Sequence, residues 1–187
     1  MAEAYTVLWT VERYRWLRRV GDEGPIEVVF GGPHTSLPSI AGVRPGDSIF
    51  PVAVIDGSLR LIAHLTVDRI LSPEQFVLER FRLVLRPGQT WDMFFHELEK
   101  TRPDIGHRVP TTCADQAAVG QGTAIRFDRI FPGADLTHLR FGPKASKERP
   151  LTGITDDRLT NSFSLQGHVR RLSADSAERI AQEFESA

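Results

Sequence analysis

The stretch Gly42–Ile70, GVRPGDSIFPVAVIDGSLRLIAHLTVDRI, decides the fold. Its first apolar run follows a Gly/Pro turn, and Asp56-Gly57 separates that run from a second one. Aspartate and glycine both tolerate the positive φ angles that a two-residue hairpin turn requires. Apolar residues alternate with more polar ones from Leu59 to Val67, which gives a strand with one core-facing side. The stretch therefore predicts a β-hairpin that forms one wall of a sheet.

The residues before the hairpin predict two further strands and a helix. Aromatic and β-branched residues from Tyr5 to Val11 are typical of a strand. Residues 12–20 predict a short helix that ends at Gly21, because its apolar positions recur every third residue. Residues 25–30 predict the next strand. Two glycines and two prolines interrupt residues 31–39, GGPHTSLPS, and make them a loop.

The residues after the hairpin alternate between strand and helix signals. Residues 76–85 are rich in strand formers and predict a strand, although a helix-start signal, Ser72-Pro73, precedes them. Residues 91–100 predict an amphipathic helix with Thr90 as its N-cap. We expect residues 101–122 to be a loop with a short helix at 114–119, and residues 123–130 to be a strand.

The C-terminal part predicts loops, one strand and one helix. Residues 131–159 are loop-rich, and residues 161–172 predict the last strand. Ser173 is the expected N-cap of the final helix, which has one apolar face that contains Ile180 and Phe184. Many short strands with few helices predict an α+β fold, built as a small barrel or a strongly bent sheet.

Composition fits one domain without an overall basic surface. The chain has 187 residues, of which 41% are hydrophobic, and a chain of this length buries about 70% of its unfolded surface. Lysine and arginine number 23 against 24 acidic residues, for a net charge of −1. A duplex-binding protein with many phosphate contacts is usually more basic. A partner that is contacted at one base or one small group is compatible with this charge.

No motif indicates a membrane span, a disulfide, a metal or a cofactor. No apolar run approaches the roughly 18 residues of a transmembrane helix, and the N-terminus lacks the features of a secretory signal, so we expect a cytoplasmic protein. Cys113 is the only cysteine. It lies near His107 and Asp115 in sequence, but catalytic sets are usually assembled from distant segments. We therefore predict no catalytic residue, no metal and no cofactor.

Four segments, in their order along the chain, resemble the PUA-like superfamily. They are TVLWTV (6–11), VVFGGPHTS (28–36), VRPGDSIF (43–50) and LQGHVRRLSADSAERIAQEF (165–184). The resemblance is to EVE and YTH domains and, more distantly, to ASCH domains, and it covers residues 5–85 and 123–185. It implies a single PUA-like (EVE-like) domain over 1–187, a small β-barrel with peripheral helices, with an insertion at 86–122.

The resemblance also implies a ligand pocket. Domains of this type bind RNA or DNA, often by taking one modified base into a pocket, and the loop after the second strand lines it. In this chain Gly-Gly-Pro-His replaces the family's usual aromatic-polar sequence in that loop. The candidate ligand-binding residues are Trp9, Trp16, Phe30, Gly31, Gly32, His34, Thr35 and Ser36. The alternatives are that the tryptophans belong to the core and that the loop is a plain surface turn.

A local excess of basic residues suggests where phosphates bind. Between Arg126 and Arg171 the chain has nine Lys/Arg and five Asp/Glu, a net charge of +4. A basic face of this kind fits a nucleic-acid backbone, and an ordinary solvated loop is the alternative. Arg140, Lys144 and Lys147 are the candidate phosphate-binding residues.

These residues together predict a nucleic-acid-binding domain that reads a single base, modified or unmodified. The partner is then RNA, DNA or a nucleoside-like ligand. The first alternative is a small enzyme on the same barrel that acts on a nucleoside or another small substrate. A further alternative is an interaction module without a pocket. A pocket with several titratable groups favours the enzyme, whereas aromatic walls favour the reader.

Overall fold

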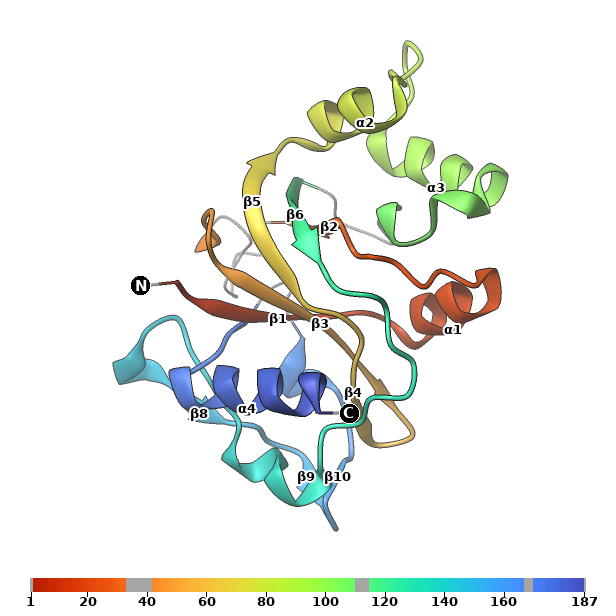
Figure 1. Ribbon diagram of the computed structural model, residues 1–187. Helices are drawn as coiled ribbons and strands as arrows, with labels where there is room; N and C mark the ends of the chain where they lie inside the picture. Colours follow the sequence, from red (N-terminus) through yellow and green to blue (C-terminus); the bar gives the residue numbers. More distant parts are fainter. Residues whose placement is uncertain (1, 33–41, 110–114, 167–169, 187) are drawn as a thin grey trace.

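A computed structural model describes residues 2–32, 42–109, 115–166 and 170–186 and shows an α+β fold (Figure 1). One mixed sheet has the strand order β11-β1-β3-β5-β6-β2, and β4 pairs with β3. The pair β1–β3 is parallel and the other pairs are antiparallel. The strands are β1 (Ala4–Leu8), β2 (Val28–Gly31), β3 (Ser48–Ile55), β4 (Ser58–Leu61), β5 (Leu65–Leu71), β6 (Gln116–Gly122) and β11 (Arg170–Arg171).

The predicted α+β class is therefore confirmed. Strand β5 curves strongly in Figure 1, so the sheet is bent. No pairing between described residues joins the outer strands β2 and β11, and the sheet is not seen to close into a barrel. No helix in this described part of the chain is long and apolar enough to cross a membrane.

The predicted hairpin is present around Asp56-Gly57, where φ is 49° and 77°. Its second arm is shorter than predicted, because β4 ends at Leu61 and the chain continues as the separate strand β5. At this break the His64 backbone N–H donates to Thr123, which turns the chain towards β6. The opening turn is held by Asp47, whose carboxylate accepts hydrogen bonds from the Glu3 and Arg44 backbone N–H groups, each at 2.8 Å.

Three predicted helices are confirmed, two of them with the predicted N-caps Thr90 and Ser173. Helix α1 (Val11–Val20) starts after Thr10 and ends at Gly21, which has the left-handed φ of 69°. Helix α3 (Trp91–Thr101) starts after Thr90, and helix α4 (Ala174–Glu185) starts after Ser173. In each case the N-cap hydroxyl accepts a hydrogen bond from a backbone N–H in the first turn, as N-cap residues do.

The strand predicted over residues 76–85 is wrong, because helix α2 (Pro73–Phe81) occupies this region. Ser72 and Gln75 form a reciprocal capping box at its start. The strand-forming residues Phe76 and Val77 are buried on the inner side of this helix. Burial, and not an extended backbone, explains their apolar character.

Two more predictions in the middle of the chain are wrong. Strand β6 lies where a short helix was predicted at 114–119, and residues 123–130 form no strand apart from a single bridge between Ile130 and Arg60. Because β6 pairs with both β5 and β2, the C-terminal end of the range 86–122 is an integral part of the sheet.

The rest of the chain forms short elements. The strand predicted over 161–172 contains only η5 and β11, with residues 167–169 outside the described part. The short elements are η2 (Pro103–Arg108), η3 (Gly133–His138), β7 (Arg140–Phe141), η4 (Ala145–Lys147), β8 (Arg149–Pro150), β9 (Ile154–Thr155), β10 (Arg158–Leu159) and η5 (Phe163–Leu165).

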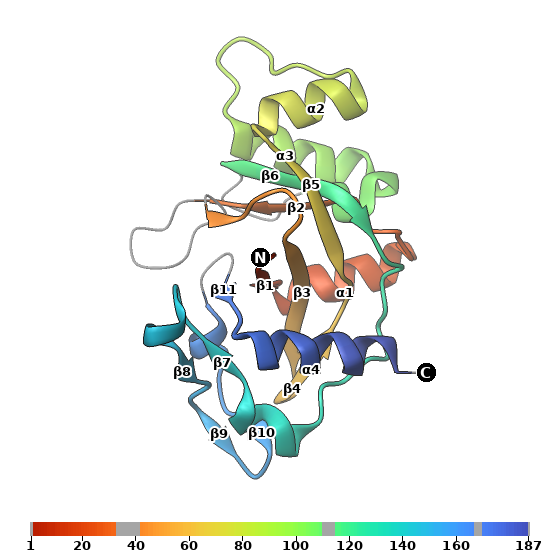
Figure 2. The same ribbon diagram turned by 60° about the vertical axis from the view of Figure 1, so that its left-hand side comes forward.

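Buried apolar residues form three clusters. The first joins α1 to one face of the sheet and includes Trp9. The second lies under α4, which runs across the sheet in Figure 2, and includes Ile180. The third joins α2, α3 and η2 to β2 and β6, and Phe30 packs against it. Helix α1 is therefore packed on the sheet through the first cluster. Another side of α1 lies near Glu99 of α3.

Candidate nucleic-acid interface

An open cleft of about 650 Å³ lies between α1 and α3. Residues three or four apart on a helix lie on one face. Helix α1 therefore presents Arg15 and Arg19 on the same side and Trp16 next to them. Trp16 is partly buried and packs against the first apolar cluster. The cleft is lined by Thr10, Glu12, Arg13, Arg15, Trp16, Arg19 and Glu99.

Arg13 is a structural part of the cleft wall. Its side chain donates hydrogen bonds to the carbonyls of Val109 and, at 2.8 Å, His107, and its guanidinium lies 4.7 Å from the centre of the Trp9 ring. Burial lowers the pKa of Arg13 to about 10, although the negative charges of Glu99 and Asp22 oppose this shift. Arg13 is therefore cationic at neutral pH, and two of its donors hold α1 against the residues at the end of η2.

Four other side chains of the cleft make no polar contact with a described residue. Within the described residues, no hydrogen bond or ion pair involves the side chains of Arg15, Arg19, Glu99 or the indole of Trp16. The cleft thus combines an aromatic face, free guanidinium donors and a free carboxylate acceptor. These are the groups that bind a planar ring carrying an anionic substituent.

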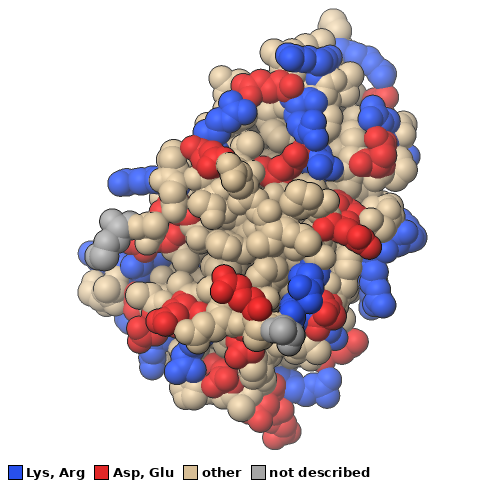
Figure 3. All heavy atoms as spheres, viewed as in Figure 1, with Lys and Arg blue, Asp and Glu red and all other residues tan. Residues whose placement is uncertain are grey.

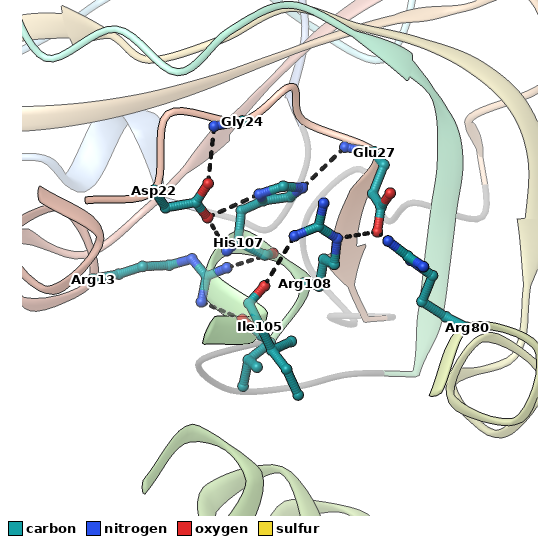
Figure 4. A network of polar contacts seen from close by, with 9 residues as sticks. Arg13, Asp22, Gly24, Glu27, Arg80, Ile105, His107 and Arg108 are labelled. Carbon is teal, nitrogen blue, oxygen red and sulfur yellow. Dashed lines mark hydrogen bonds and ion pairs between the residues drawn. The ribbon is translucent and has the colours of Figure 1, made fainter. Parts of the chain in front are cut away.

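A buried network next to this cleft connects Asp22 and His107 (Figure 4). The Nδ1 atom of His107 is 2.9 Å from Asp22 Oδ2, and its Nε2 accepts a hydrogen bond from the Glu27 backbone N–H at 3.2 Å. Burial raises the pKa of Asp22, but hydrogen bonds from His107 and Gly24 outweigh this and lower it to about 2. Both ring nitrogens of His107 are used within the protein, so this pair is structural and gives the enzymatic alternative no support.

Glu27 extends the network towards α2. Its carboxylate accepts hydrogen bonds from Arg80, at 2.7 Å, and from Arg108, and these bonds lower the pKa of Glu27 against the effect of burial. The side chains in Figure 4 thus tie the start of β2 to α2 and η2.

Of the predicted aromatic ligand-binding residues, the structure places Trp16 in the cleft. Trp9 is only 7% exposed and lies under Arg13. Phe30 packs edge-on against Phe76, with ring centres 5.2 Å apart, and belongs to the third cluster.

The predicted pocket loop is only partly described. Gly31 and Gly32 are buried, and Gly31 pairs with Gln116 of β6. His34, Thr35 and Ser36 lie outside the described residues, as does Cys113. The role of this loop therefore stays a prediction.

The predicted phosphate-binding residues lie on the β7–η4–β8 hairpin, residues 140–150. Arg140, Lys144 and Lys147 are exposed there, and no ion pair to another described residue involves them. Behind the hairpin, the guanidinium of Arg170 lies 5.1 Å from the centre of the Phe141 ring, and burial lowers its pKa. In Figures 1 and 2 this hairpin and α1 lie far apart.

The face of the molecule shown in Figure 3 has no continuous basic patch, because acidic and basic side chains are interspersed on it. This agrees with the net charge of −1 and favours contact with a short segment over a long duplex. The described residues contain no group of three His, Cys, Asp or Glu side chains placed to hold a metal ion. Comparison with known proteins gives no match to a family model, a curated protein or a solved structure.

Sequence reasoning missed most of the cleft. The spacing of Arg15 and Arg19 around Trp16 was a readable signal, because residues three and four apart on a helix share a face. Glu99 carried no such signal, since it belongs to a different helix and only the packing of α3 near α1 brings it to the cleft.

Proposed function

We propose that the chain is a nucleic-acid-binding domain that reads a single base, modified or unmodified, and that this base stacks on Trp16. The observation that carries the proposal is the partly buried indole of Trp16 in a cleft of about 650 Å³, flanked by Arg15 and Arg19. Stacking of one base on an aromatic side chain contributes about 1–3 kcal/mol. The neighbouring guanidinium groups then contact the phosphates on either side of that base.

The fold supports a PUA-like architecture for this reader. The bent mixed sheet, the helix α1 directly after β1 and the capped helix α4 at the C-terminal end are compatible with the peripheral helices that the motifs imply, while closure of the sheet into a barrel stays a prediction. In this proposal the exposed cations of the β7–η4–β8 hairpin contact more distant phosphates.

The test is a titration of short single-stranded RNA and DNA oligonucleotides with the parent protein and the variant Trp16→Leu. Loss of one stacked base predicts binding about 5- to 150-fold weaker. Trp91→Leu is the matched control, because Trp91 is also partly buried but packs against Phe94 and Phe95 in the third cluster. The control is expected to bind as the parent does, and circular dichroism checks the fold of both variants.

Two results would contradict the proposal. A parent protein that binds neither RNA nor DNA rejects nucleic-acid binding altogether. Equal affinities for the parent and a well-folded Trp16→Leu variant would instead keep nucleic-acid binding but remove the base from this cleft.

A further inference from the structure

We infer that the cleft between α1 and α3 selects guanine, with the Glu99 carboxylate accepting hydrogen bonds from the base while Trp16 stacks on its ring. This inference rests on the proposed function and names the base that the same site reads. The two helices that line the cleft carry different side-chain chemistry. Helix α1 supplies the aromatic face and the cations, and α3 supplies the carboxylate.

The carboxylate decides which base fits. An ionised carboxylate only accepts hydrogen bonds, so it selects a base that presents donors. The guanine edge presents two adjacent donors, the N1–H group and the 2-amino group. Adenine and cytosine each place a ring acceptor next to their amino group, and uracil places carbonyl acceptors on both sides of its N–H. Only guanine can therefore offer two donors to one carboxylate without facing it with an acceptor.

Glu99 is the acidic residue of the cleft that comes from α3, and no hydrogen bond or ion pair to another described residue involves its carboxylate. It is partly buried, and its charge acts on the buried guanidinium of Arg13, whose pKa it raises. Arg13 does not use up the acceptor, because its own donors bind the carbonyls of His107 and Val109. Glu12, in contrast, is exposed in the first turn of α1, where a negative charge stabilises the helix dipole.

The cations of the cleft favour a nucleotide over a cationic peptide. An arginine side chain of a peptide could also stack on Trp16 and pair with Glu99. It would, however, enter a cleft with three arginines and two glutamates, and Arg15 and Arg19 would repel it. The same two guanidinium groups attract the phosphate of a nucleotide.

The test compares oligonucleotides that differ in one base. The full chain is titrated with a uracil-rich strand that carries one guanine, one inosine or one adenine at the same position. Inosine keeps N1–H but lacks the 2-amino group, and adenine presents an acceptor at N1. Because a hydrogen bond to a charged group is worth about 1.5–3 kcal/mol, we expect affinity to fall at least about tenfold from guanine to inosine, and further to adenine.

The variant Glu99→Gln is expected to bind the three strands with affinities within about threefold of each other, because an amide presents an N–H donor group beside its acceptor oxygen and can pair with a base edge that carries an acceptor. Glu97→Gln is the matched control on the same helix, since the Glu97 carboxylate binds Arg86 and Gln89 instead of lining the cleft. This control should retain the preference of the parent for guanine, and thermal melts check that both variants are folded.

The outcomes separate the inference from the proposed function. Oligonucleotide binding that requires Trp16 but ignores the exchange of guanine for inosine and adenine overturns guanine selection and leaves the base reader intact. A guanine preference that survives Glu99→Gln also overturns the inference. Absence of any oligonucleotide binding, together with binding of N-acetyl-arginine amide that Glu99→Gln removes, would overturn both and make the cleft a site for peptide cations.

Discussion

The Nδ1 atom of His107 lies 2.9 Å from Oδ2 of Asp22, and both side chains are almost completely enclosed, with 0% and 10% of their surfaces exposed. The carboxylate of Asp22 also accepts hydrogen bonds from the backbone N–H groups of Gly24 and His107. A segment between α1 and β2 is thereby joined to η2. Arg13 of α1 binds carbonyls at the end of η2. The contact between Asp22 and His107 therefore holds the part of η2 against which α1, with Trp16 and the cleft, is packed.

We expect the stability of the protein to fall between about pH 4 and pH 2 because of Asp22. The pKa of Asp22 is lowered in the folded state from 3.8 to about 2 by its hydrogen bonds to His107 and Gly24, which outweigh its burial. In this window the unfolded chain binds more protons than the folded chain at this residue, so the free energy of unfolding decreases as the pH falls. The contribution is fully present above about pH 4.

The variant Asp22→Asn tests this link. Its amide nitrogen would face N–H groups of His107, so we expect a loss of about 2 kcal/mol at neutral pH and a flatter dependence on pH below 4. Urea unfolding at several pH values measures both effects. Asp156→Asn, in an exposed turn, is the control and should follow the parent curve. A parent-like acid profile for Asp22→Asn would show that another carboxylate is responsible.

The variant Ser72→Ala is expected to destabilise the protein by about 1 kcal/mol, because it removes the N-cap of α2. Ser72 Oγ accepts a hydrogen bond from the Gln75 backbone N–H at 3.2 Å, and the Gln75 side chain accepts one from the Ser72 backbone N–H at 3.0 Å. Urea unfolding measures the loss. Ser146→Ala, at an exposed position in η4, is the control, and equal stability of the two variants would contradict the importance of the cap.

Helix α2 also shows what could be predicted from the sequence and what could not. The caps Thr90 and Ser173 and the turn at Asp56-Gly57 act within a few residues, so their local signals were sufficient. At residues 76–85 the prediction followed the apolar, strand-forming composition and not the helix-start signal at Ser72, which is equally local. The predicted strand was therefore wrong.

Other features depend on packing between distant segments. Strand β6 is rich in alanine and glycine, and its position between β5 and β2 depends on how closely the strands approach one another. The cleft is similar, because Trp16 was a candidate from the sequence but Glu99 joins it only through the packing of α3 near α1. Trp9 and Phe30 had the same aromatic signal as Trp16, and only the fold distinguishes their core positions.

The variant Gly120→Ala is expected to destabilise the protein by about 3 kcal/mol, at the upper end of the range for overpacking. A Cβ atom at Gly120 would lie 1.9 Å from the carbonyl oxygen of Thr66 on β5. Because this neighbour is backbone, β5 and β6 would have to separate. Gly42→Ala is the matched control, since the nearest atom to its Cβ, the Tyr5 hydroxyl oxygen, is 4.0 Å away. Thermal unfolding of both variants measures the difference, and similar midpoints would contradict the close approach.

The variant Lys144→Ala tests whether the β7–η4–β8 hairpin contacts phosphates. If it does, the affinity for oligonucleotides should fall by a similar factor for every sequence, and the slope of log K against log salt should become flatter by about one unit. Lys100→Ala, at an exposed position on α3, is the control and should leave the slope unchanged. Arg19→Ala provides the comparison at the cleft, since the helix α1 that carries Arg19 lies far from the hairpin in Figures 1 and 2. If Arg19→Ala flattens the slope and Lys144→Ala does not, the nucleic-acid strand passes along α1, and the hairpin is excluded from the interface.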